Sequence, residues 1–137
     1  MTMYSKILIP IAPDHLGHVA AALELAEVLR AKDGKIILMS AIEAAPAHMQ
    51  SHMPDDYLIK EKAEAVAKLQ KDADGHGNTE VMVVTGKPSG SILEHAKLTN
   101  SDCIIIGSHK PDYMDYFIGS TAARVVRHAQ CSVHVIR

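Results

Sequence analysis

Five short runs of apolar residues, separated by longer amphipathic segments, constrain the fold of this chain more than any other feature. Each run is rich in β-branched residues, and the apolar residues continue through it instead of alternating with polar ones. Such a pattern is typical of strands that are buried on both faces of a sheet. The runs are Lys6–Ile11, Lys35–Ile42, Glu80–Val84, Asp102–Ile106 and Ser132–Ile136.

Four helices are predicted between these strands, from apolar residues that recur three and four positions apart. We expect Asp33-Gly34 to end the first helix, since glycine commonly follows a last helical turn. Alternating strands and helices predict a doubly wound α/β domain with a five-stranded parallel sheet. The helices are Leu16–Ala31, one near Ile59–Gln70 behind Asp55-Asp56, Ser89–Leu98 behind Pro88, and Ser120–His128.

The apolar positions of two helices also predict which residues they bury. Ile59, Ala63, Val66 and Leu69 share one face of the second long helix, and Ala122, Val125, Val126 and Ala129 share one face of the last. The stretch Glu43–Pro54 has no periodicity and is expected to be an irregular loop. With 137 residues and no linker or repeat, the chain is predicted to form one domain over residues 1–137.

Charge and composition exclude several classes of protein. Lys and Arg number 14 against 16 Asp and Glu, so a nucleic-acid or anionic-membrane partner held by bulk charge is not expected. With no Trp, one Phe and four Tyr, the chain lacks the aromatic residues of a base-stacking platform. No apolar run approaches the roughly 18 residues of a membrane span. Cys103 and Cys131 are predicted to be buried free thiols, which favours the cytoplasm.

The loops after the strands are the places to look for a ligand, because open α/β sheets bind ligands beyond the carboxyl ends of their strands. Gly107-Ser108-His109-Lys110 leaves the fourth strand, and Gly119-Ser120-Thr121 opens the last helix. Glycines let backbone N–H groups approach an anion, and a helix start adds a partial positive charge. Alternatively, Gly107 makes a tight turn and Ser120 is only an N-cap.

The stretch Ile104–Arg137, IIIGSHKPDYMDYFIGSTAARVVRHAQCSVHVIR, resembles the C-terminal signature of the universal stress protein family. The beginning KILIPI and the spacing of all five strands match as well, so the resemblance covers the whole chain. It implies the strand order 3-2-1-4-5, an adenine-nucleotide-binding type of fold and a homodimer. In many members ATP lies between the loops after the first and fourth strands.

Carried over to this sequence, the family pattern implies a site for ATP or a related adenine nucleotide, with Mg²⁺ accompanying the phosphates. This sequence has Lys110 in place of the second glycine of the family's ATP-binding pattern. Eight residues instead of nine separate Lys110 from the next glycine of the pattern, Gly119. This shortened loop looks like one branch of the family. The nucleotide-binding residues implied are Pro10, Ile11, Ala12, Ala41, Gly107, Ser108, His109, Lys110, Gly119, Ser120 and Thr121.

Ala12 is the larger departure, because ATP-binding members usually have Asp there, in contact with the nucleotide. Loss of one charged contact costs about 1.5–3 kcal/mol, and Asp14 replaces it only if the loop bends differently. Two functions therefore remain: an ATP-binding stress-response regulator that acts as a homodimer, or a dimeric interaction protein that has lost ATP. No general base is placed for rapid catalysis, so at most slow ATP hydrolysis is expected.

Other polar groupings are less specific. His48 and His52, and likewise His15 and His18, lack further ligands at metal-binding spacing, so solvated loop histidines are favoured and no metal site is predicted. A hydrolytic triad of Ser108, His109 and Asp112 is disfavoured, because adjacent side chains at a strand end diverge and the nucleophile-elbow pattern is absent.

The last strand, Ser132–Ile136, predicts how the chain associates. It is expected at the edge of the sheet. Cys131, Val133 and Val135 are predicted on one face, and Ser132, His134 and Ile136 on the other. An apolar edge exposes unpaired N–H and C=O groups, and antiparallel pairing with a twofold copy satisfies them. We therefore predict a homodimer through Ser132–Ile136, together with a protein partner that the sequence does not name.

Overall fold

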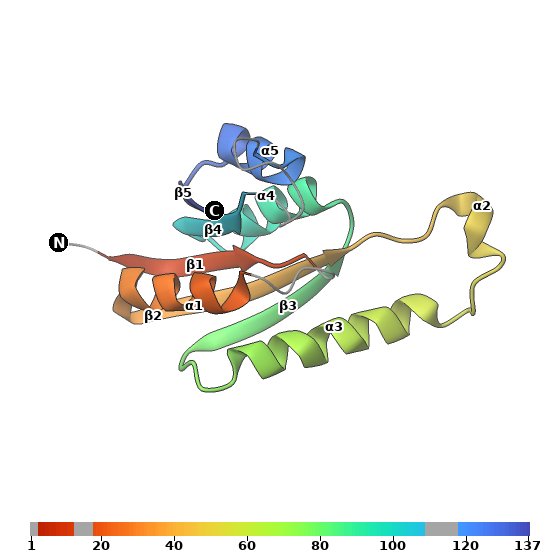
Figure 1. The fold of residues 1–137 in the computed structure, drawn as a ribbon, viewed down its shortest axis with the longest axis horizontal. Helices are drawn as coiled ribbons and strands as arrows, with labels where there is room; N and C mark the ends of the chain where they lie inside the picture. Colours follow the sequence, from red (N-terminus) through yellow and green to blue (C-terminus); the bar gives the residue numbers. More distant parts are fainter. Residues whose placement is uncertain (1–2, 13–17, 109–117) are drawn as a thin grey trace.

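The strands of the computed structural model, which describes residues 3–12, 18–108 and 118–137, form one sheet with helices on both faces (Figure 1). All neighbouring strands are parallel, and their order is β3-β2-β1-β4-β5. Both the predicted doubly wound sheet and its order are therefore confirmed. The strands are β1 (Tyr4–Pro10), β2 (Arg30–Ile42), β3 (Thr79–Thr85), β4 (Cys103–Gly107) and β5 (Ser132–Ile136).

The long helices divide between the two faces of the sheet. Residues of α1 and α3 pack in one core cluster, and residues of α4 and α5 pack in the other. This division follows from right-handed crossovers, because the chain winds first towards β3 and then back towards β5. The helices are α1 (Val19–Leu29), α2 (Ala47–Gln50), α3 (Tyr57–Ala73), α4 (Pro88–Leu98) and α5 (Ser120–His128).

Successive residues of the central strand β1 are buried on opposite faces. Ile7 and Ile9 belong to the cluster under α1, whereas Leu8 belongs to the cluster under α4 and α5. None of the three is more than 1% exposed. The continuous apolar runs of the sequence thus reflect burial on both sides, as predicted.

The prediction for the end of α1 is wrong. The helix ends at Leu29 instead of Ala31, and β2 begins at Arg30 instead of Lys35. Gly34 is a buried strand residue and does not end a helix; a Cβ there would lie 2.9 Å from the Tyr4 carbonyl oxygen and 2.6 Å from Cγ of Arg30. Glycine is needed here because the chain passes close to β1, across an irregular register between Tyr4 and Lys6.

Three smaller predictions also need correction. The irregular stretch after β2 contains the short helix α2, so the described residues hold five helices and not four. Ile59 is 71% exposed, because the first turns of α3 extend beyond the end of the sheet (Figure 1). Val126 on α5 is 47% exposed, whereas Ala122 and Val125 are buried as expected.

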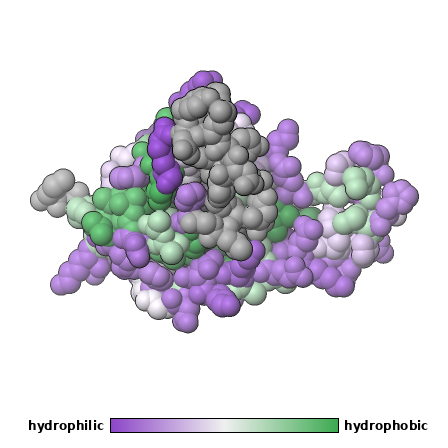
Figure 2. Space-filling model, in the orientation of Figure 1, coloured by the Kyte–Doolittle hydropathy of each residue, from purple (hydrophilic) through white to green (hydrophobic). Residues whose placement is uncertain are grey.

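Hydrophilic side chains line the edge of the molecule along which α3 runs (Figure 2). The lower edge of that view is mostly hydrophilic, in keeping with a helix in which only Leu69 is fully buried. Across the described ranges, no helix is long and apolar enough to cross a membrane.

Candidate functional site

The carboxyl ends of β1 and β4 lie side by side at the point where the winding of the sheet reverses. After β1 the chain turns towards α1 and β2, and after β4 it turns towards α5 and β5. The place between the two exits, here called the crevice, is the usual ligand site of an open parallel sheet.

The exit from β1 is held in place by β2. The N–H of Ile11 donates to the Met39 carbonyl oxygen at 2.7 Å, and the Ser40 hydroxyl donates to the Ile11 carbonyl oxygen at 2.7 Å. Ser40 is 3% exposed, so its hydroxyl is committed to this contact. Ala12 follows as an exposed residue, and Ala41 on β2 is buried.

The exit from β4 is tied to the first turn of α5. Ser108 is 2% exposed, and its N–H donates to the Ile136 carbonyl oxygen of β5 at 2.8 Å. Its own carbonyl oxygen accepts the N–H of Gly119. These two bonds bring Gly107, Ser108 and the beginning of α5 to one place, although ten residues separate Ser108 from Gly119 in sequence.

The start of α5 has the properties of an anion site. Gly119 is the N-cap residue, with φ −64° and ψ 156°, and Ser120 is the first helical residue. The alternative in which Ser120 is the N-cap is therefore wrong, and Gly119 has no side chain with which to cap the helix. The first-turn N–H groups have no acceptor within the helix and carry the positive end of its dipole.

Most of the predicted nucleotide-binding residues are thus gathered around one crevice. Pro10, Ile11, Ala12 and Ala41 lie on the β1–β2 side, and Gly107, Ser108, Gly119, Ser120 and Thr121 lie on the β4–α5 side. His109 and Lys110 lie outside the described residues, as does Asp14.

Comparison with known proteins bears on what this crevice holds. Residues 3–137 match the universal stress protein family. The chain belongs to that family.

Relatives of this universal stress protein cover essentially its whole length. It is 22% identical over 143 residues to a universal stress protein of Methanothermobacter thermautotrophicus, with 98% of this chain and 97% of the relative covered. It is 27% identical over 143 residues to universal stress protein G of Salmonella typhimurium, with 98% and 100% covered.

Solved structures show the same fold. The structure of the hypothetical protein MJ0577 has a TM-score of 0.81 and 24% identity, covering 98% of this chain and 96% of that one. The Archaeoglobus fulgidus universal stress protein in complex with dAMP has a TM-score of 0.62 and 17% identity, covering 99% and 100%. An Arabidopsis thaliana family member with AMP bound has a TM-score of 0.63 and 19% identity, covering 96% and 90%. Two structural relatives therefore hold adenine nucleotides.

His18 is a residue of the crevice that the sequence reasoning missed, because it was taken for a solvated loop histidine. Its imidazole packs on the backbone of Gly107, where a Cβ would lie 3.2 Å from Cδ2 of the ring. The residue is only partly exposed. It is the N-cap of α1, and its place in the sequence between β1 and α1 is the signal that points to the crevice.

No three His, Cys, Asp or Glu side chains converge on a possible metal site within the described ranges. His48 on α2 and His52 in the turn after it are both exposed.

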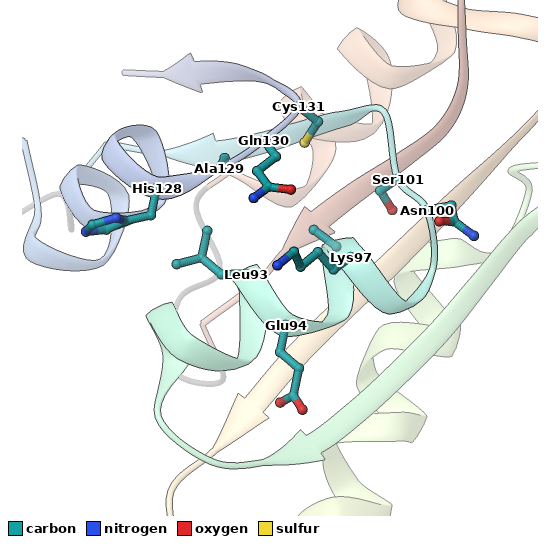
Figure 3. A pocket seen from close by; sticks show the side chains of 10 residues that line it. Leu93, Glu94, Lys97, Asn100, Ser101, His128, Ala129, Gln130 and Cys131 are labelled. Atoms are coloured by element: carbon teal, nitrogen blue, oxygen red, sulfur yellow. The ribbon is translucent and has the colours of Figure 1, made fainter.

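A groove of about 610 Å³ lies at the opposite end of the sheet, between the last turns of α4 and α5 (Figure 3). Lys97 and Gln130 project into the space between the two helices, and the Cys131 thiol lies at the base of β5. The remaining lining residues are Leu93, Glu94, Ala96, Asn100, Ser101, His128 and Ala129. None of the predicted nucleotide-binding residues lines this groove.

The two cysteines are free thiols on opposite faces of the sheet. Cys103 is buried, as predicted, whereas Cys131 is only partly buried. Burial, with smaller contributions from Cys131 and Asp102, raises the pKa of the Cys103 thiol from 9.0 to about 11. Burial also raises the pKa of the Cys131 thiol. Both groups remain protonated at neutral pH and are weak nucleophiles.

Proposed function

We propose that this universal stress protein binds ATP, with Mg²⁺ accompanying the phosphates, and acts as a homodimeric stress-response regulator. The phosphates would lie at the first turn of α5, and the adenosine would lie across the end of β1 towards Ala41. The observation that carries the proposal is the bond from the Gly119 N–H to the Ser108 carbonyl oxygen, which brings the α5 start to the crevice.

The residues of the crevice fit such a ligand. Ala12, Ala41 and Gly119 are small, so their own side chains fill little of the space beyond the strand ends. The donors at the start of α5 suit phosphate oxygens, since helix N-termini combine oriented N–H groups with a positive dipole. The dAMP and AMP held by two structural relatives support adenine as the base.

Calorimetric titration with Mg²⁺-ATP tests the proposal, and the Ser120→Asp variant sharpens it. Ser120 is exposed at the start of α5, where an added carboxylate interacts favourably with the helix dipole and leaves the fold intact. The same carboxylate repels phosphate, so we expect ATP affinity to fall about tenfold or more. No heat and no thermal shift in the wild-type protein at millimolar ATP would reject ATP binding.

Ser89→Asp is the matched control. Ser89 lies in the first turn of α4, so the variant places the same charge at the start of another helix, the one that follows the edge strand β3. We expect unchanged ATP affinity. Equal losses in Ser89→Asp and Ser120→Asp would mean that net charge, and not the α5 site, governs binding.

A second candidate function follows from Ala12. The exposed methyl group stands where ATP-binding relatives of this type usually have a carboxylate, so one polar contact to the nucleotide is missing. If wild-type protein binds no adenine nucleotide, we propose instead a dimeric interaction protein that regulates a protein partner without ATP.

The homodimer is proposed through β5, which lies at one end of the sheet. The Ile136 carbonyl oxygen accepts a bond from Ser108 and therefore points towards β4. Because N–H and C=O groups alternate in direction along a strand, those of Val133 and Val135 point outwards. These outward groups support pairing with a twofold copy of β5.

Proline substitution at Val133 tests this dimer. It removes an outward N–H while leaving the β4–β5 ladder intact, so dimers should dissociate at lower protein concentration than with Val133→Ala. Sedimentation velocity measures both variants. A wild-type protein that remains monomeric at tens of micromolar, a concentration on the order of ordinary dimer dissociation constants, would contradict the proposal.

We also propose that the protein works in the cytoplasm, on the basis of its two free cysteines. Reducing compartments keep such thiols unpaired. Fractionation of cells that express the tagged protein tests this, and recovery in a membrane or periplasmic fraction would contradict it.

A further inference from the structure

Arg124 lies in the middle of α5, one turn after the residues that open the helix. It follows Ser120 by four positions, so the Cβ atoms of the two residues are about 6 Å apart on the same side of the helix. That side faces away from the sheet, because Ala122 and Val125 form the buried side of α5. Ser120 and Arg124 are both exposed. The two side chains therefore share one surface of α5.

The direction of helical side chains brings Arg124 towards the start of α5. Every Cα–Cβ bond of an α-helix tilts towards the amino end, so a long side chain covers the turn that precedes its own residue. Here that turn is the first turn of α5, which begins at Ser120. An anion bound at the first turn is therefore within reach of the Arg124 guanidinium.

The Arg124 guanidinium has no partner in the part of the chain that the structure describes. No ion pair and no hydrogen bond among the described residues includes it. The helix α5 contains no Asp or Glu with which it could pair. The Arg30 guanidinium, in contrast, donates to Glu27 and to the Gly77 carbonyl oxygen. The charge of Arg124 is thus available to a ligand.

The second arginine of α5, Arg127, differs from Arg124 in its position along the helix. Arg127 lies in the last turn, where the negative end of the helix dipole interacts favourably with a cation. This effect falls off within one turn of the helix end, so Arg124 gains little from it. The helix dipole therefore explains the charge of Arg127 but not that of Arg124.

The proposed phosphate site lacks any other fixed charge among its described residues. None of the described residues predicted to bind the nucleotide has a charged side chain. The first-turn N–H groups offer only the partial positive charge of the helix dipole to a triphosphate. A guanidinium is charged at all ordinary pH values and donates two parallel N–H bonds to phosphate oxygens.

We propose that Arg124 contacts the terminal phosphates of bound ATP and makes the site selective for nucleoside triphosphates over monophosphates. The inference rests on the proposed nucleotide site and names a specificity-determining residue of that site. The first-turn N–H groups hold the phosphate nearest the adenosine, and the guanidinium holds the terminal phosphates on the outer surface of α5. A monophosphate ends before that surface.

Calorimetric titration of wild-type protein, Arg124→Gln and Arg124→Lys with ATP and AMP tests this role. Glutamine is a good helix former, so the exposed substitution leaves α5 intact. For Arg124→Gln we expect ATP to bind about tenfold more weakly, because hydrogen bonds to a charged group are lost, and AMP affinity to stay unchanged. Lysine keeps the charge without the paired N–H donors, so Arg124→Lys should recover part of the ATP affinity.

Arg127→Gln is the matched control, because it removes the same charge from the same helix near its other end. Its ATP affinity should equal that of wild-type protein. Salt supplies a second readout. Raising the salt concentration from about 50 to about 200 mM should weaken ATP binding more in wild-type protein than in Arg124→Gln, since one contact between charges is missing in the variant.

The outcomes separate this inference from the proposal on which it rests. If wild-type protein binds neither ATP nor AMP, the nucleotide site and the role of Arg124 are both rejected. If wild-type protein binds ATP and Arg124→Gln binds it equally well, only the role of Arg124 is rejected. Equal losses of ATP affinity in Arg124→Gln and Arg127→Gln would assign the effect to net charge. Equal losses of ATP and AMP affinity in Arg124→Gln would overturn the selectivity for triphosphates.

Discussion

The two ends of the parallel sheet are held together by different kinds of contact. At the amino end, side chains bond across strands: the Asp102 carboxylate accepts the N–H groups of Ser5 and Lys6, each at 2.9 Å. Lys6 Nζ donates to the Thr99 carbonyl oxygen at 2.7 Å. At the carboxyl end, backbone bonds join β4, β5 and α5, and small residues surround the crevice.

The difference shows how a parallel sheet separates stability from binding. All strands begin at the same end, so their first N–H groups need acceptors there, and Asp102 supplies two. At the other end the helices begin, and their first N–H groups need acceptors that a ligand is able to supply. A charged side chain thus stabilises the fold at the amino end, while the helix-start N–H groups at the carboxyl end are the donors that the proposed anion would use.

The largest effect is expected from removing the Asp102 carboxylate at the amino end, which tests whether the two ends of the sheet are independent. Asp102→Ala leaves two N–H groups of β1 without their charged acceptor, so we expect a loss of about 3 kcal/mol in the free energy of unfolding. Urea denaturation measures it. ATP affinity, measured on the folded protein, should stay unchanged because the crevice lies at the opposite end.

Two further variants serve as controls for the stability loss expected in Asp102→Ala. Asp102→Asn keeps one oxygen acceptor and should lose less stability than alanine. Glu61→Ala, on the exposed surface of α3, should change stability by less than about 0.5 kcal/mol. A similar loss in Glu61→Ala, or a large loss of ATP affinity in Asp102→Ala, would show that the two ends are not independent.

The second prediction concerns the Cys103 thiol, which is buried at the amino end of β4. The Cys103 thiol has a folded-state pKa of about 11, raised from 9.0 mainly by burial. The unfolded chain ionises first, so the stability present below pH 9 is lost as the pH rises from 9 towards 11. At pH 10.5, which is 1.5 units above the unfolded-state pKa of 9.0, the free energy of unfolding should be about 2 kcal/mol lower than below pH 9.

The Cys103→Ala variant isolates this effect. It lacks the thiol, so its free energy of unfolding should fall less between pH 9 and pH 10.5 than that of wild-type protein. Urea denaturation at several pH values measures the two slopes. Parallel slopes would mean that lysine and tyrosine ionisation, and not the buried thiol, causes the alkaline loss.

Sequence reasoning worked best where local and tertiary preferences agree. The bounds of α5 and β5 were predicted to the residue, because an amphipathic run and an apolar run follow each other directly. The prediction that Gly107 and Gly119 lie near one ligand site followed from the topology of an open parallel sheet. The strand order came from the family resemblance and was confirmed.

The errors occurred where distant partners decide the structure. The Arg30 guanidinium donates to the Gly77 carbonyl oxygen before β3, a partner 47 residues away in sequence. Asn78, with a φ of 52°, donates from its side chain to the Gly34 carbonyl oxygen at 2.7 Å. No local pattern shows these contacts, so Gly34 resembled a helix stop. The packing of His18 on Gly107 was missed for the same reason.

The third prediction adds a charged side chain to the carboxyl end. Ala12→Asp places a carboxylate on the exposed residue that follows the β1 exit. If the missing contact limits affinity, ATP should bind about tenfold more tightly, or about 1.4 kcal/mol. Calorimetry measures it, with Ala20→Asp on the exposed face of α1 as the control. Unchanged or weaker binding would mean that the adenosine is held by other groups.

The smallest effect is expected from Gly107→Ala, which probes the contact across the crevice directly. Alanine lowers the entropy of the unfolded chain, a gain of about 0.4–1 kcal/mol, and the φ of Gly107 is not in the left-handed region. The new Cβ, however, lies 3.2 Å from the His18 ring, which must shift by a few tenths of an ångström. The two effects oppose each other, so stability should hardly change in wild-type protein.

A double-mutant cycle separates those opposing effects. In the His18→Ala background the ring is gone, and Gly107→Ala should stabilise the protein by about 0.4–1 kcal/mol, because only the entropic gain remains. Thermal and urea denaturation of the four proteins give the coupling energy between Gly107 and His18. Equal effects of Gly107→Ala in both backgrounds would mean that the ring does not rest on Gly107. If Gly107→Ala stabilises only the His18→Ala protein, the His18 side chain links α1 to β4 across the crevice. The other described contacts at this end of the sheet are mainly backbone bonds.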